Sequence, residues 1–418
     1  MAKTSEVEII LVGNELLKGE RRDSHAQFIG NLIGTIGVRL TRAHIVPDDR
    51  EIIGDTVRRR MRSARAIVVS GGLGPTHDDI TREAVADGLG ASLEFREDQW
   101  KWIVGVFSRF NKTPHESNKR QAYFPPGSEV IPNALGTAPG FMIEKDGCLV
   151  AVLPGPPREL RPMMESTVLD KLQSIFRRDP LFTETFRTTG IGESDMTPKV
   201  GPLFANFEKE FVVSSLPHLG GVDVVLTART DGDLKKLKKR ADKFEASLRE
   251  ILGAHVFGKG TRSFQAVVGD LLIKRGETLG VSESLTGGLI GKNLTDTPGS
   301  SAYLLADVVA YSNESKVEFV GVRKASLKKH GAVSEVVCRE MAAGIRARTD
   351  ATYGLATTGI AGPDGGTKEK PVGLTYFGLA SGDGEEIRHR VFPGDRITIR
   401  ERVAYATLYL LYRKLTRV

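Results

Sequence analysis

Short apolar runs alternate with stretches of helical periodicity along most of the 418-residue chain. In the first third, apolar runs at Glu8–Val12, Val38–Val46 and Ala66–Ser70 indicate buried strands. Asp23–Ile36 and Asp49–Arg62 lie between them and place their apolar residues on one helical face. This order of strand, helix and strand predicts a parallel sheet covered by helices, and therefore an α/β fold.

The pattern changes in the middle of the chain, where compact α+β structure is expected. The elements predicted there are a strand from Thr183, a helix from Glu193, strands Glu210–Ser215 and Gly221–Arg229, and a helix Asp231–Leu252. Because 418 residues exceed what one hydrophobic core usually supports, we expect several domains. The changes in pattern place them at residues 1–178, 179–260 and 261–418.

Residues 277–296 are the stretch most suggestive of chemistry. An apolar run, Thr278–Val281, leads through Ser282–Gly288 into helix-periodic residues, which predicts a strand, a tight turn and a helix start. Such a turn exposes one hydroxyl and presents unpaired backbone N–H groups to an anion or an oxyanion. Ser284 is the hydroxyl best placed for attack. Alternatively, the hydroxyl only caps the helix and the glycine pair only lets the chain turn.

A candidate base follows the next predicted strand of this region. Val308–Tyr311 ends before a helix that begins near Asn313, from which Lys316 would project back toward the strand ends. A partly desolvated amine held there could take a proton from Ser284, as in Ser–Lys hydrolases. A plain surface lysine is the alternative. His330 is a second candidate base, although a lone histidine at a turn is more often structural.

Two N-terminal loops, residues 13–15 and 71–81, fall beyond predicted strand ends, where parallel sheets bind ligands. In the second loop, glycines let backbone N–H groups approach a phosphate, and Asp78 and Asp79 can hold a hard cation. Alternatively, Asp79 or Thr81 only caps the helix that follows. Neither a P-loop nor a GxGxxG fingerprint is present, which counts against ordinary ATP hydrolysis and plain dinucleotide binding.

Composition and charge narrow the class of partner. Hydrophobic residues make up 40% of the chain and charged residues 27%, as in ordinary folded proteins. The formal charge of +7 favours anionic ligands in general. The basic residues are dispersed, however, and the densest run, Lys235–Arg240, fits a solvated helix face better than a nucleic-acid patch. Sparse aromatic residues also weaken a stacking platform for single strands.

The number of cysteines and the absence of long apolar segments indicate in which cellular compartment the protein is expected. Cys148 and Cys338 are the only cysteines, so neither a disulfide framework nor a cysteine-based zinc site is expected. The N-terminus lacks a signal-peptide pattern, and no apolar segment is long enough to span a bilayer. We therefore expect a cytoplasmic protein without a membrane partner.

Four N-terminal motifs in a fixed order carry a resemblance to a known family. GGLGPTHDDITREAVA, NKRQA, GTAPG and LPGPPREL resemble the N-terminal domain of the competence/damage-inducible protein A (CinA) family, which is similar to the nucleotide-binding domain of molybdenum-cofactor biosynthesis proteins. The resemblance implies an ADP-ribose pyrophosphatase that uses a divalent metal ion (Mg, Mn or Co) and releases AMP and ribose 5-phosphate. It implies metal ligands at Glu15, Asp78 and Asp79. The implied nucleotide-binding residues are Gly71, Gly72, Gly74, Thr76, Lys119 and Gly155.

Two positions depart from the family pattern. The family often has Asp where this chain has Asn14, and commonly Asn where this chain has His25 after Asp23. Because Asn14 cannot lend a charge to a metal, a weakened or re-tuned pyrophosphatase is one alternative. A molybdopterin-type binding module without hydrolysis is another.

The middle segment resembles the small KH-like domain of the same family. A KH module that grips RNA needs a GxxG loop between two helices. No such spacing occurs from Thr183 to Gly260, where the adjacent Gly220 and Gly221 belong to a predicted hairpin turn. We expect a spacer or dimerisation element that binds no nucleic acid, and a homodimer on family analogy alone.

The C-terminal motifs ESLTGG, PGSSAY, YSNESK, HGAVSE, TTGIAGPDGG, EKPVG and FPGDR resemble the CinA C-terminal domain over nearly its whole length. The resemblance implies a nicotinamide-nucleotide amidase, which hydrolyses nicotinamide mononucleotide to nicotinate mononucleotide and ammonia without a cofactor. Ser284 would attack the carboxamide carbon and Lys316 would accept its proton, while Tyr311 and Thr358 orient or relay that proton. Many relatives carry Cys where this chain has Leu285, so a thiol at that position is not required.

The same resemblance implies how the substrate is held. Backbone N–H groups of Thr286, Gly287 and Gly288 would hold the oxyanion. The other implied binding residues, three of them placed for phosphate and ribose, are Asn313, Gly359, Gly362 and Arg396. The whole chain would be a two-activity enzyme of pyridine-nucleotide salvage. A non-enzymatic partner in DNA uptake or repair, suggested by the family's name, is the remaining alternative, and the dispersed basic residues count against it.

Overall fold

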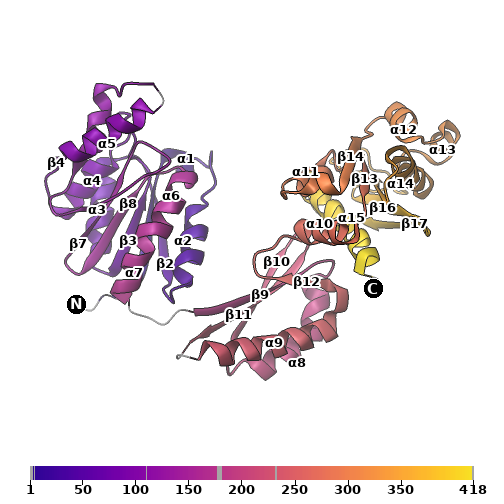
Figure 1. Cartoon of the computed structure of the whole chain (residues 1–418), viewed down its shortest axis with the longest axis horizontal. Helices are drawn as coiled ribbons and strands as arrows, with labels where there is room; N and C mark the ends of the chain where they lie inside the picture. The colour runs from indigo at the N-terminus through magenta and orange to yellow at the C-terminus, as the bar shows by residue number, and fades with distance from the viewer. Residues whose placement is uncertain (1–2, 4, 110, 177–180, 231–232, 417–418) are drawn as a thin grey trace. The chain divides into compact units, whose positions relative to one another are not determined.

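A computed structural model describes residues 3, 5–109, 111–176, 181–230 and 233–416. These residues form two compact units, one made mainly of Met1–Phe182 and the other of Thr183–Ala228 and Asp233–Val418. The boundary predicted between residues 178 and 179, and the helix start predicted at Asp231, lie outside the described residues. The predicted α/β class is confirmed (Figure 1).

The N-terminal unit is built on a six-stranded sheet in the order β2-β1-β3-β8-β7-β6. Its strands are β1 (Ser5–Val12), β2 (Leu40–Val46), β3 (Ala64–Ser70), β6 (Glu129–Ile131), β7 (Gly140–Lys145) and β8 (Cys148–Leu153). The first, second, third and eighth strands are parallel, as predicted, whereas β7 and β6 are antiparallel additions. The reason is local: Asp146 and Gly147, both with positive φ, make a two-residue turn that can only join antiparallel strands.

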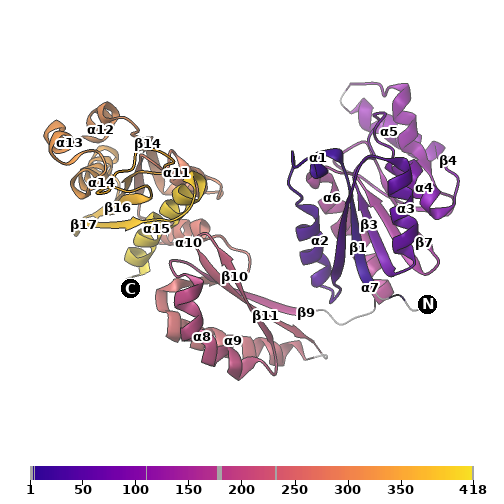
Figure 2. The same ribbon diagram turned by 180° about the vertical axis from the view of Figure 1, so that it is seen from behind.

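Helices cover both faces of this sheet, which Figures 1 and 2 show from opposite sides. One face packs against α2 (His25–Gly34), α6 (Pro157–Met163) and α7 (Leu169–Phe176), and the other against α3 (Arg50–Met61) and α4 (Thr81–Leu89). A π-helical turn at Met164–Val168 joins α6 to α7, so that the three form one helical segment ending at Phe176. The smaller elements are α1 (Asn14–Leu17), α5 (Glu97–Ser108), a 3-10 helix at Glu116–Ala122, and the strand pair β4 (Glu94–Phe95) and β5 (Tyr123–Phe124).

The second unit begins with a four-stranded sheet in the order β10-β11-β9-β12. Its strands and helices are β9 (Leu181–Thr188), α8 (Glu193–Phe207), β10 (Val212–His218), β11 (Gly221–Arg229), α9 (Leu234–Leu252) and β12 (Val256–Lys259), with a 3-10 turn at Gly253–His255. An aromatic cluster holds the helices to the sheet: the Phe244 ring stacks on Phe186 and Phe204 and meets Phe207 edge-on. The Gly220–Gly221 hairpin turn predicted from the sequence is confirmed by the pairing of His218 with Gly221.

The rest of this unit is a five-stranded sheet in the order β14-β13-β15-β16-β17. Its strands are β13 (Leu279–Glu283), β14 (Leu304–Val309), β15 (Tyr353–Gly359), β16 (Leu374–Ser381) and β17 (Gly384–Val391). The first three are parallel, and β16 and β17 are antiparallel. The helices are α10 (Phe264–Arg275), α11 (Leu289–Thr295), α12 (Asn313–Val320), α13 (Lys324–His330), α14 (Glu335–Thr349) and α15 (Arg396–Thr416), with a 3-10 turn at Ser300–Ala302. Helices α10, α11 and α15 cover one face, and α12 and α14 cover the other (Figure 2).

Several local predictions were wrong. The strand predicted at Val308–Tyr311 spans Leu304–Val309, because β14 is a half-exposed edge strand whose apolar signal is weak. The loop predicted at residues 13–15 contains the first residues of α1. Neither Asp79 nor Thr81 caps α4, whose N-cap residue is Ile80.

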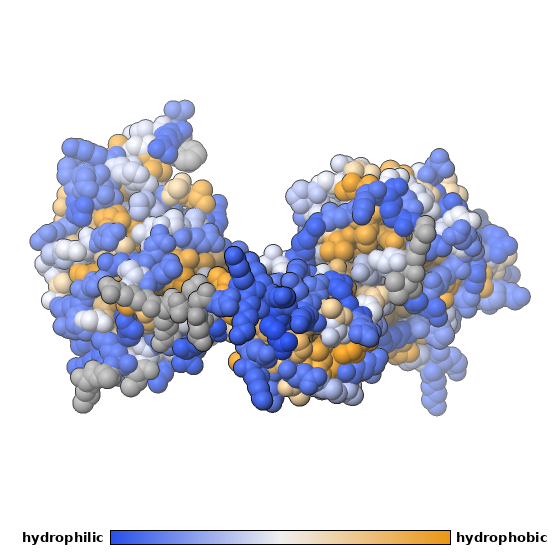
Figure 3. Space-filling model, turned by 60° about the horizontal axis from the view of Figure 1, so that its bottom comes forward, coloured by the Kyte–Doolittle hydropathy of each residue, from blue (hydrophilic) through white to orange (hydrophobic). Residues whose placement is uncertain are grey.

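Hydrophilic residues dominate the face of the molecule in Figure 3, where hydrophobic residues gather only in small patches. The lysines of the basic run on α9 are solvent-exposed: Lys235, Lys236, Lys238 and Lys239. Among the described helices, none combines the length and apolar character needed to cross a lipid bilayer.

Candidate functional sites

Three parallel strands of the C-terminal sheet end together at one edge. Ser284 follows β13, Tyr311 follows β14 by one residue, and Thr358 lies at the end of β15. Since β13 pairs with both neighbours, the polar residues after these strands meet at the same edge of the sheet. The Ser284 N–H donates to the Thr357 carbonyl at 3.1 Å, which fixes the start of the turn to the neighbouring strand.

The central feature of this edge is a serine–lysine pair. The Lys316 Nζ lies 3.0 Å from the Ser284 Oγ. Lys316 belongs to α12, whose N-cap Ser312 accepts the Ser315 N–H, so that the helix directs the lysine back toward the strand ends. Ser284 is 8% exposed and Lys316 1% exposed. The alternative that Lys316 is a plain surface lysine therefore does not hold.

The surroundings of Lys316 weaken the binding of its proton. Its amine also donates to the Ala310 carbonyl at 2.7 Å and to the Tyr311 carbonyl at 3.2 Å. No carboxylate pairs with it among the described residues. Burial lowers the pKa of Lys316 to about 8, because removal from water penalises the charged amine. A neutral amine at this place can accept a proton near neutral pH.

The turn after Ser284 is held from inside the protein. Gly287 and Gly288 adopt positive φ values of 62° and 86°, which favour glycine. The buried Glu283 carboxylate accepts the N–H groups of Gly288, Ile290 and Gly291 at 2.7–3.0 Å. The first turn of α11 is thereby fixed to the residue that precedes the nucleophile candidate.

These bonds correct the oxyanion donors expected from the sequence. The Gly287 N–H donates to the Ser284 carbonyl and the Gly288 N–H to Glu283, so neither is free for a ligand. In the described part of the chain, the N–H groups of Leu285 and Thr286 have no protein acceptor. The Thr286 hydroxyl is buried and bonds to the Thr357 hydroxyl at 2.8 Å.

The two residues expected to relay the proton lie apart from the pair. The Thr358 hydroxyl is buried and donates to the Ala332 carbonyl at 2.8 Å. Tyr311 is 59% exposed, and its hydroxyl accepts a hydrogen bond from Arg396 at 3.0 Å. The other Arg396 nitrogen donates to the Gly362 carbonyl at 2.8 Å. Hydrogen bonds thus link three residues: Tyr311, Arg396 and Gly362. We call them the rim, and Arg396 gives it an exposed positive charge.

The remaining C-terminal candidates have mostly structural surroundings. A Cβ at Gly359 would lie 2.7 Å from the Leu374 carbonyl, so this glycine serves close strand packing. Asn313 begins α12 and is exposed. His330 ends α13, is exposed, and its carbonyl accepts a hydrogen bond from Lys370.

Two residues of this site were not singled out from the sequence. Arg400 on α15 donates two hydrogen bonds to the Thr286 carbonyl, at 2.7 and 3.2 Å. Glu283 was present in the ESLTGG motif, but its role needs the backbone geometry of α11. Leu285 points into a core cluster that includes Phe377 and Ile399, away from the polar edge.

The N-terminal motifs also converge on one place, a cavity of about 410 Å³ at the strand ends of the first sheet. Its lining includes Gly71, Gly72, Gly74 and Gly155, and it is formed by the two predicted loops together with residues of the GTAPG and LPGPPREL motifs. A Cβ at Gly71, whose φ is 112°, would lie 2.3 Å from the Val12 carbonyl, so only glycine fits there. The backbone therefore stays open to a ligand, as a phosphate site requires.

The acidic candidates line this cavity without forming a ready metal cage. Glu15, Asp78 and Asp79 are all in its lining, together with Asp48 and Arg21, which the sequence did not single out. Within the described residues, no three His, Cys, Asp or Glu side chains lie close enough together to hold a metal ion. The three predicted ligands therefore cannot all bind the same ion in this arrangement.

Thr76 and Lys119 do not line the cavity. The Thr76 backbone N–H and hydroxyl both donate to the Asp79 carboxylate, and Thr76 also lowers the pKa of Asp78 by hydrogen bonding. Lys119 pairs with Glu116 at 2.9 Å on the surface. Thr76 therefore orients the acidic loop, and the Lys119 amine is engaged elsewhere.

The two positions that depart from the family pattern have structural roles. The Asn14 backbone N–H donates to Asp48 at 2.8 Å, next to the cavity. His25 lies 2.9 Å from the Ser70 hydroxyl, and burial lowers its pKa.

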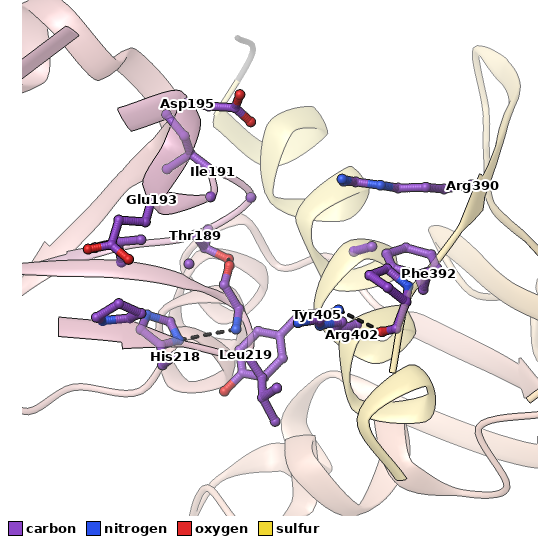
Figure 4. Close-up of a pocket in the computed structure, with 18 residues that line it drawn as sticks. Thr189, Ile191, Glu193, Asp195, His218, Leu219, Arg390, Phe392, Arg402 and Tyr405 are labelled. Carbon is purple, nitrogen blue, oxygen red and sulfur yellow. Dashed lines mark hydrogen bonds between the residues drawn. The ribbon is translucent and has the colours of Figure 1, made fainter. Parts of the chain in front are cut away.

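A second cavity, of about 370 Å³, lies between the four-stranded sheet and α15 and is drawn in Figure 4. Arg390 and Arg402 stand on one wall, and Glu193 and Asp195 come from the start of α8 on the other. Because the two walls carry opposite charges, they offer no consistent field to an ionic ligand. Tyr405 packs here against Gly220, where a Cβ would lie 2.5 Å from its ring. The cavity belongs to the packing of this unit.

Comparison with known proteins matches three families along the chain. Residues 8–174 match the "Probable molybdopterin binding domain", residues 183–258 the "Damage-inducible protein CinA KH domain", and residues 261–415 the "CinA C-terminal domain". A CinA-like protein of Solibacter usitatus is 36% identical over 415 residues, which is 98% of both chains.

Solved structures resemble parts of the chain. The protein CinA from Thermoplasma acidophilum is 34% identical with a TM-score of 0.37, over 40% of this chain and 98% of that one. The competence damage-inducible protein A of Klebsiella pneumoniae is 32% identical with a TM-score of 0.35, over 37% and 98%. The full-length similarity and the three ordered family matches show that the chain belongs to the CinA family.

Proposed function

We propose that the C-terminal domain is an amidohydrolase that converts nicotinamide mononucleotide to nicotinate mononucleotide and ammonia. The observation that carries this proposal is the buried pair of Ser284 and Lys316, 3.0 Å apart at the end of β13. Membership of the CinA family supports the substrate class.

The environment of the lysine supplies the first step. When the amine is neutral, its two hydrogens bond to the Ala310 and Tyr311 carbonyls, and its lone pair faces the Ser284 hydroxyl. Lys316 then accepts the hydroxyl proton as the Ser284 Oγ attacks the carboxamide carbon. A tetrahedral intermediate forms, with a negative oxygen. The N–H groups of Leu285 and Thr286, which have no acceptor among the described residues, would donate to that oxygen.

The protonated Lys316 next returns its proton to the leaving nitrogen, so that the C–N bond breaks and ammonia departs. The pyridine carbonyl remains as an ester on Ser284. Water then attacks this ester while Lys316 accepts a proton from it, and Lys316 returns that proton to the Ser284 Oγ as the ester C–O bond breaks, which releases nicotinate mononucleotide and restores the serine hydroxyl. Arg396 on the exposed rim supplies a cation for the substrate phosphate once it exchanges its bond to Tyr311.

Ammonia release from nicotinamide mononucleotide tests this proposal. Ser284→Ala should abolish turnover, because among the described residues Ser284 is the one hydroxyl that accepts a hydrogen bond from Lys316. Ser315→Ala is a matched control, since that serine lies on the same helix as Lys316 but bonds only to Ser312. Unchanged ammonia release by Ser284→Ala would remove the serine from the mechanism.

We also propose that the N-terminal domain hydrolyses ADP-ribose to AMP and ribose 5-phosphate. The glycine-lined cavity favours a bound pyrophosphate, because its backbone can approach the ligand closely. Its oxygen-only carboxylates fit a magnesium-like ion held by one or two protein ligands together with substrate phosphates. Glu15 and Asp78 are the residues that would hold it, and Asp79 orients the loop through Thr76.

A bound divalent ion would neutralise the pyrophosphate and activate water. AMP release from ADP-ribose in the presence of Mg, Mn or Co tests the proposal. A binding module without hydrolysis would hold ADP-ribose and release no AMP. Glu15→Gln should lower AMP release at least tenfold, whereas Glu20→Gln, an exposed acidic residue outside the cavity lining, should not.

A further inference from the structure

A second carboxyl, half-buried, lies beside the turn that carries the serine. Glu283, fully buried at the end of β13, has Asp307 of β14 as its neighbour on the same face of the sheet. Both carboxyls meet the backbone of α11 at one residue: Glu283 accepts the Gly291 N–H at 3.0 Å, and a Cβ built on Gly291 would lie 2.0 Å from the Asp307 Oδ2. The C-terminal chemistry described above uses neither the aspartate nor its contact with Glu283.

Two ionised carboxylates could not lie side by side here without a proton between them. Both Glu283 oxygens already accept backbone N–H groups of α11. The Asp307 Oδ1 is buried and has no hydrogen-bond partner among the described residues. Two ionised carboxylates offer each other only acceptors, whereas one protonated carboxyl can donate to the other. Burial, then the nearby Glu283 charge, raises the pKa of Asp307 to about 8, in agreement with the geometry.

Steric fit keeps the pair against the helix. A Cβ at Gly291 would lie 2.0 Å from the Asp307 Oδ2, so the carboxyl rests directly on the backbone of α11. Gly291 is also one of the three residues whose N–H groups Glu283 accepts. Any displacement of the pair therefore moves the start of α11, and with it the turn that follows Ser284.

We propose that Asp307 donates a proton to Glu283, and that this carboxyl pair positions the nucleophile turn for the amidase reaction. The proposal rests on the function proposed for the C-terminal domain. Asp307 is a positioning residue, because it acts through Glu283 and the α11 backbone and touches no reacting atom. Loss of its proton would place two negative charges side by side in a buried site and push Glu283 away from its N–H donors.

The charged groups on neighbouring elements do not neutralise the pair. Lys292 of α11 pairs with Asp296 at 2.6 Å. Arg400 of α15 donates to the Thr286 carbonyl, and Lys316 of α12 donates to Ser284 and two carbonyls. Ionisation of Asp307 would therefore give the pair a second negative charge that none of these cations offsets.

The test is the pH dependence of kcat in Asp307→Asn, whose amide can donate to Glu283 but cannot ionise. At pH 6.5 the variant and the wild type should turn over at similar rates. At pH 9.5, above the raised pKa of Asp307, most of the wild-type pair has lost its proton. The wild-type kcat should then be at least tenfold below that of the variant, while KM changes little. Asp296→Asn, the same change on the exposed side of α11, should follow the wild-type profile.

Parallel profiles of the wild type and Asp307→Asn would overturn the proposal. If the wild-type protein releases no ammonia at any pH, the proposed function fails. Infrared spectroscopy of the full chain then tests, independently of activity, whether Asp307 carries a proton. A carbonyl band of a buried protonated carboxyl should then be present in the wild type at pH 6.5, fade by pH 9.5 and be missing in Asp307→Asn. Its absence from the wild type would overturn the carboxyl pair independently of activity.

Discussion

Replacement of Lys316 by methionine tests the central pair through stability as well as activity. Methionine is unbranched and apolar and has a length close to that of lysine, so it fits the buried space without a charge. Burial lowers the pKa of Lys316 from 10.5 to about 8 in the folded chain. This shift of about 2.5 units corresponds to about 3 kcal/mol that the buried charge costs the folded state at neutral pH.

The sign of the pH dependence follows from proton binding. Below pH 8 both the folded and the unfolded chain hold the Lys316 proton, so the cost is fully present. Between pH 8 and 10.5 only the unfolded chain holds it, and the wild type gains stability as pH rises. The advantage of Lys316→Met over the wild type should therefore shrink by about 3 kcal/mol from pH 7 to pH 10.5. The hydrogen bonds to Ala310 and Tyr311 that the variant loses change its stability by the same amount at pH 7 and at pH 10.5. They therefore do not affect this pH dependence.

Calorimetric unfolding of both proteins at several pH values measures this difference. The two tryptophans of the chain, Trp100 and Trp102, lie on α5 of the N-terminal unit, so their fluorescence provides an internal control that should not respond. The same variant should lose about 10²- to 10⁴-fold in kcat with nicotinamide mononucleotide. A stability difference that stays constant across pH would refute the reasoning that Lys316 is a buried, titrating amine.

Three further outcomes are expected. Gly72→Ala places a Cβ 2.2 Å from the Thr81 hydroxyl at a φ of 65°, so it should destabilise the N-terminal unit by about 1–3 kcal/mol and abolish AMP release, while ammonia release continues. Arg400→Met removes both hydrogen bonds to the Thr286 carbonyl; kcat for ammonia release should fall about tenfold, which steady-state kinetics measures, and an unchanged kcat would show that the turn needs no support from α15. Treatment with a chelator should stop AMP release and leave ammonia release intact, and loss of both would contradict a metal-free amidase.

The sequence was most informative where local periodicity determines position. The apolar run before Ser284 and the glycines after it define a strand and a turn, and the helix from Asn313 carries Lys316 back to the same edge. Local pattern therefore made both residues candidates, and the family resemblance selected them over a helix cap, a surface lysine and His330. Their separation of 3.0 Å was not, because it depends on the pairing of β13 with β14.

Features that depend on distant segments were missed. Arg400 lies 114 residues after Thr286, and no local pattern connects them. The donors expected at Gly287 and Gly288 are consumed by Ser284 and Glu283, which only the turn geometry reveals. Short or half-exposed strands such as β12 and β14 give weak apolar signals, so one was overlooked and the other misplaced.

Leu285 directly follows Ser284, yet its side chain packs in the interior beside Phe377 and Ile399. The two neighbours therefore face different environments, one at the polar edge of the sheet and the other in the hydrophobic core. A cysteine introduced at position 285 would be shielded from solvent and should react slowly with thiol reagents.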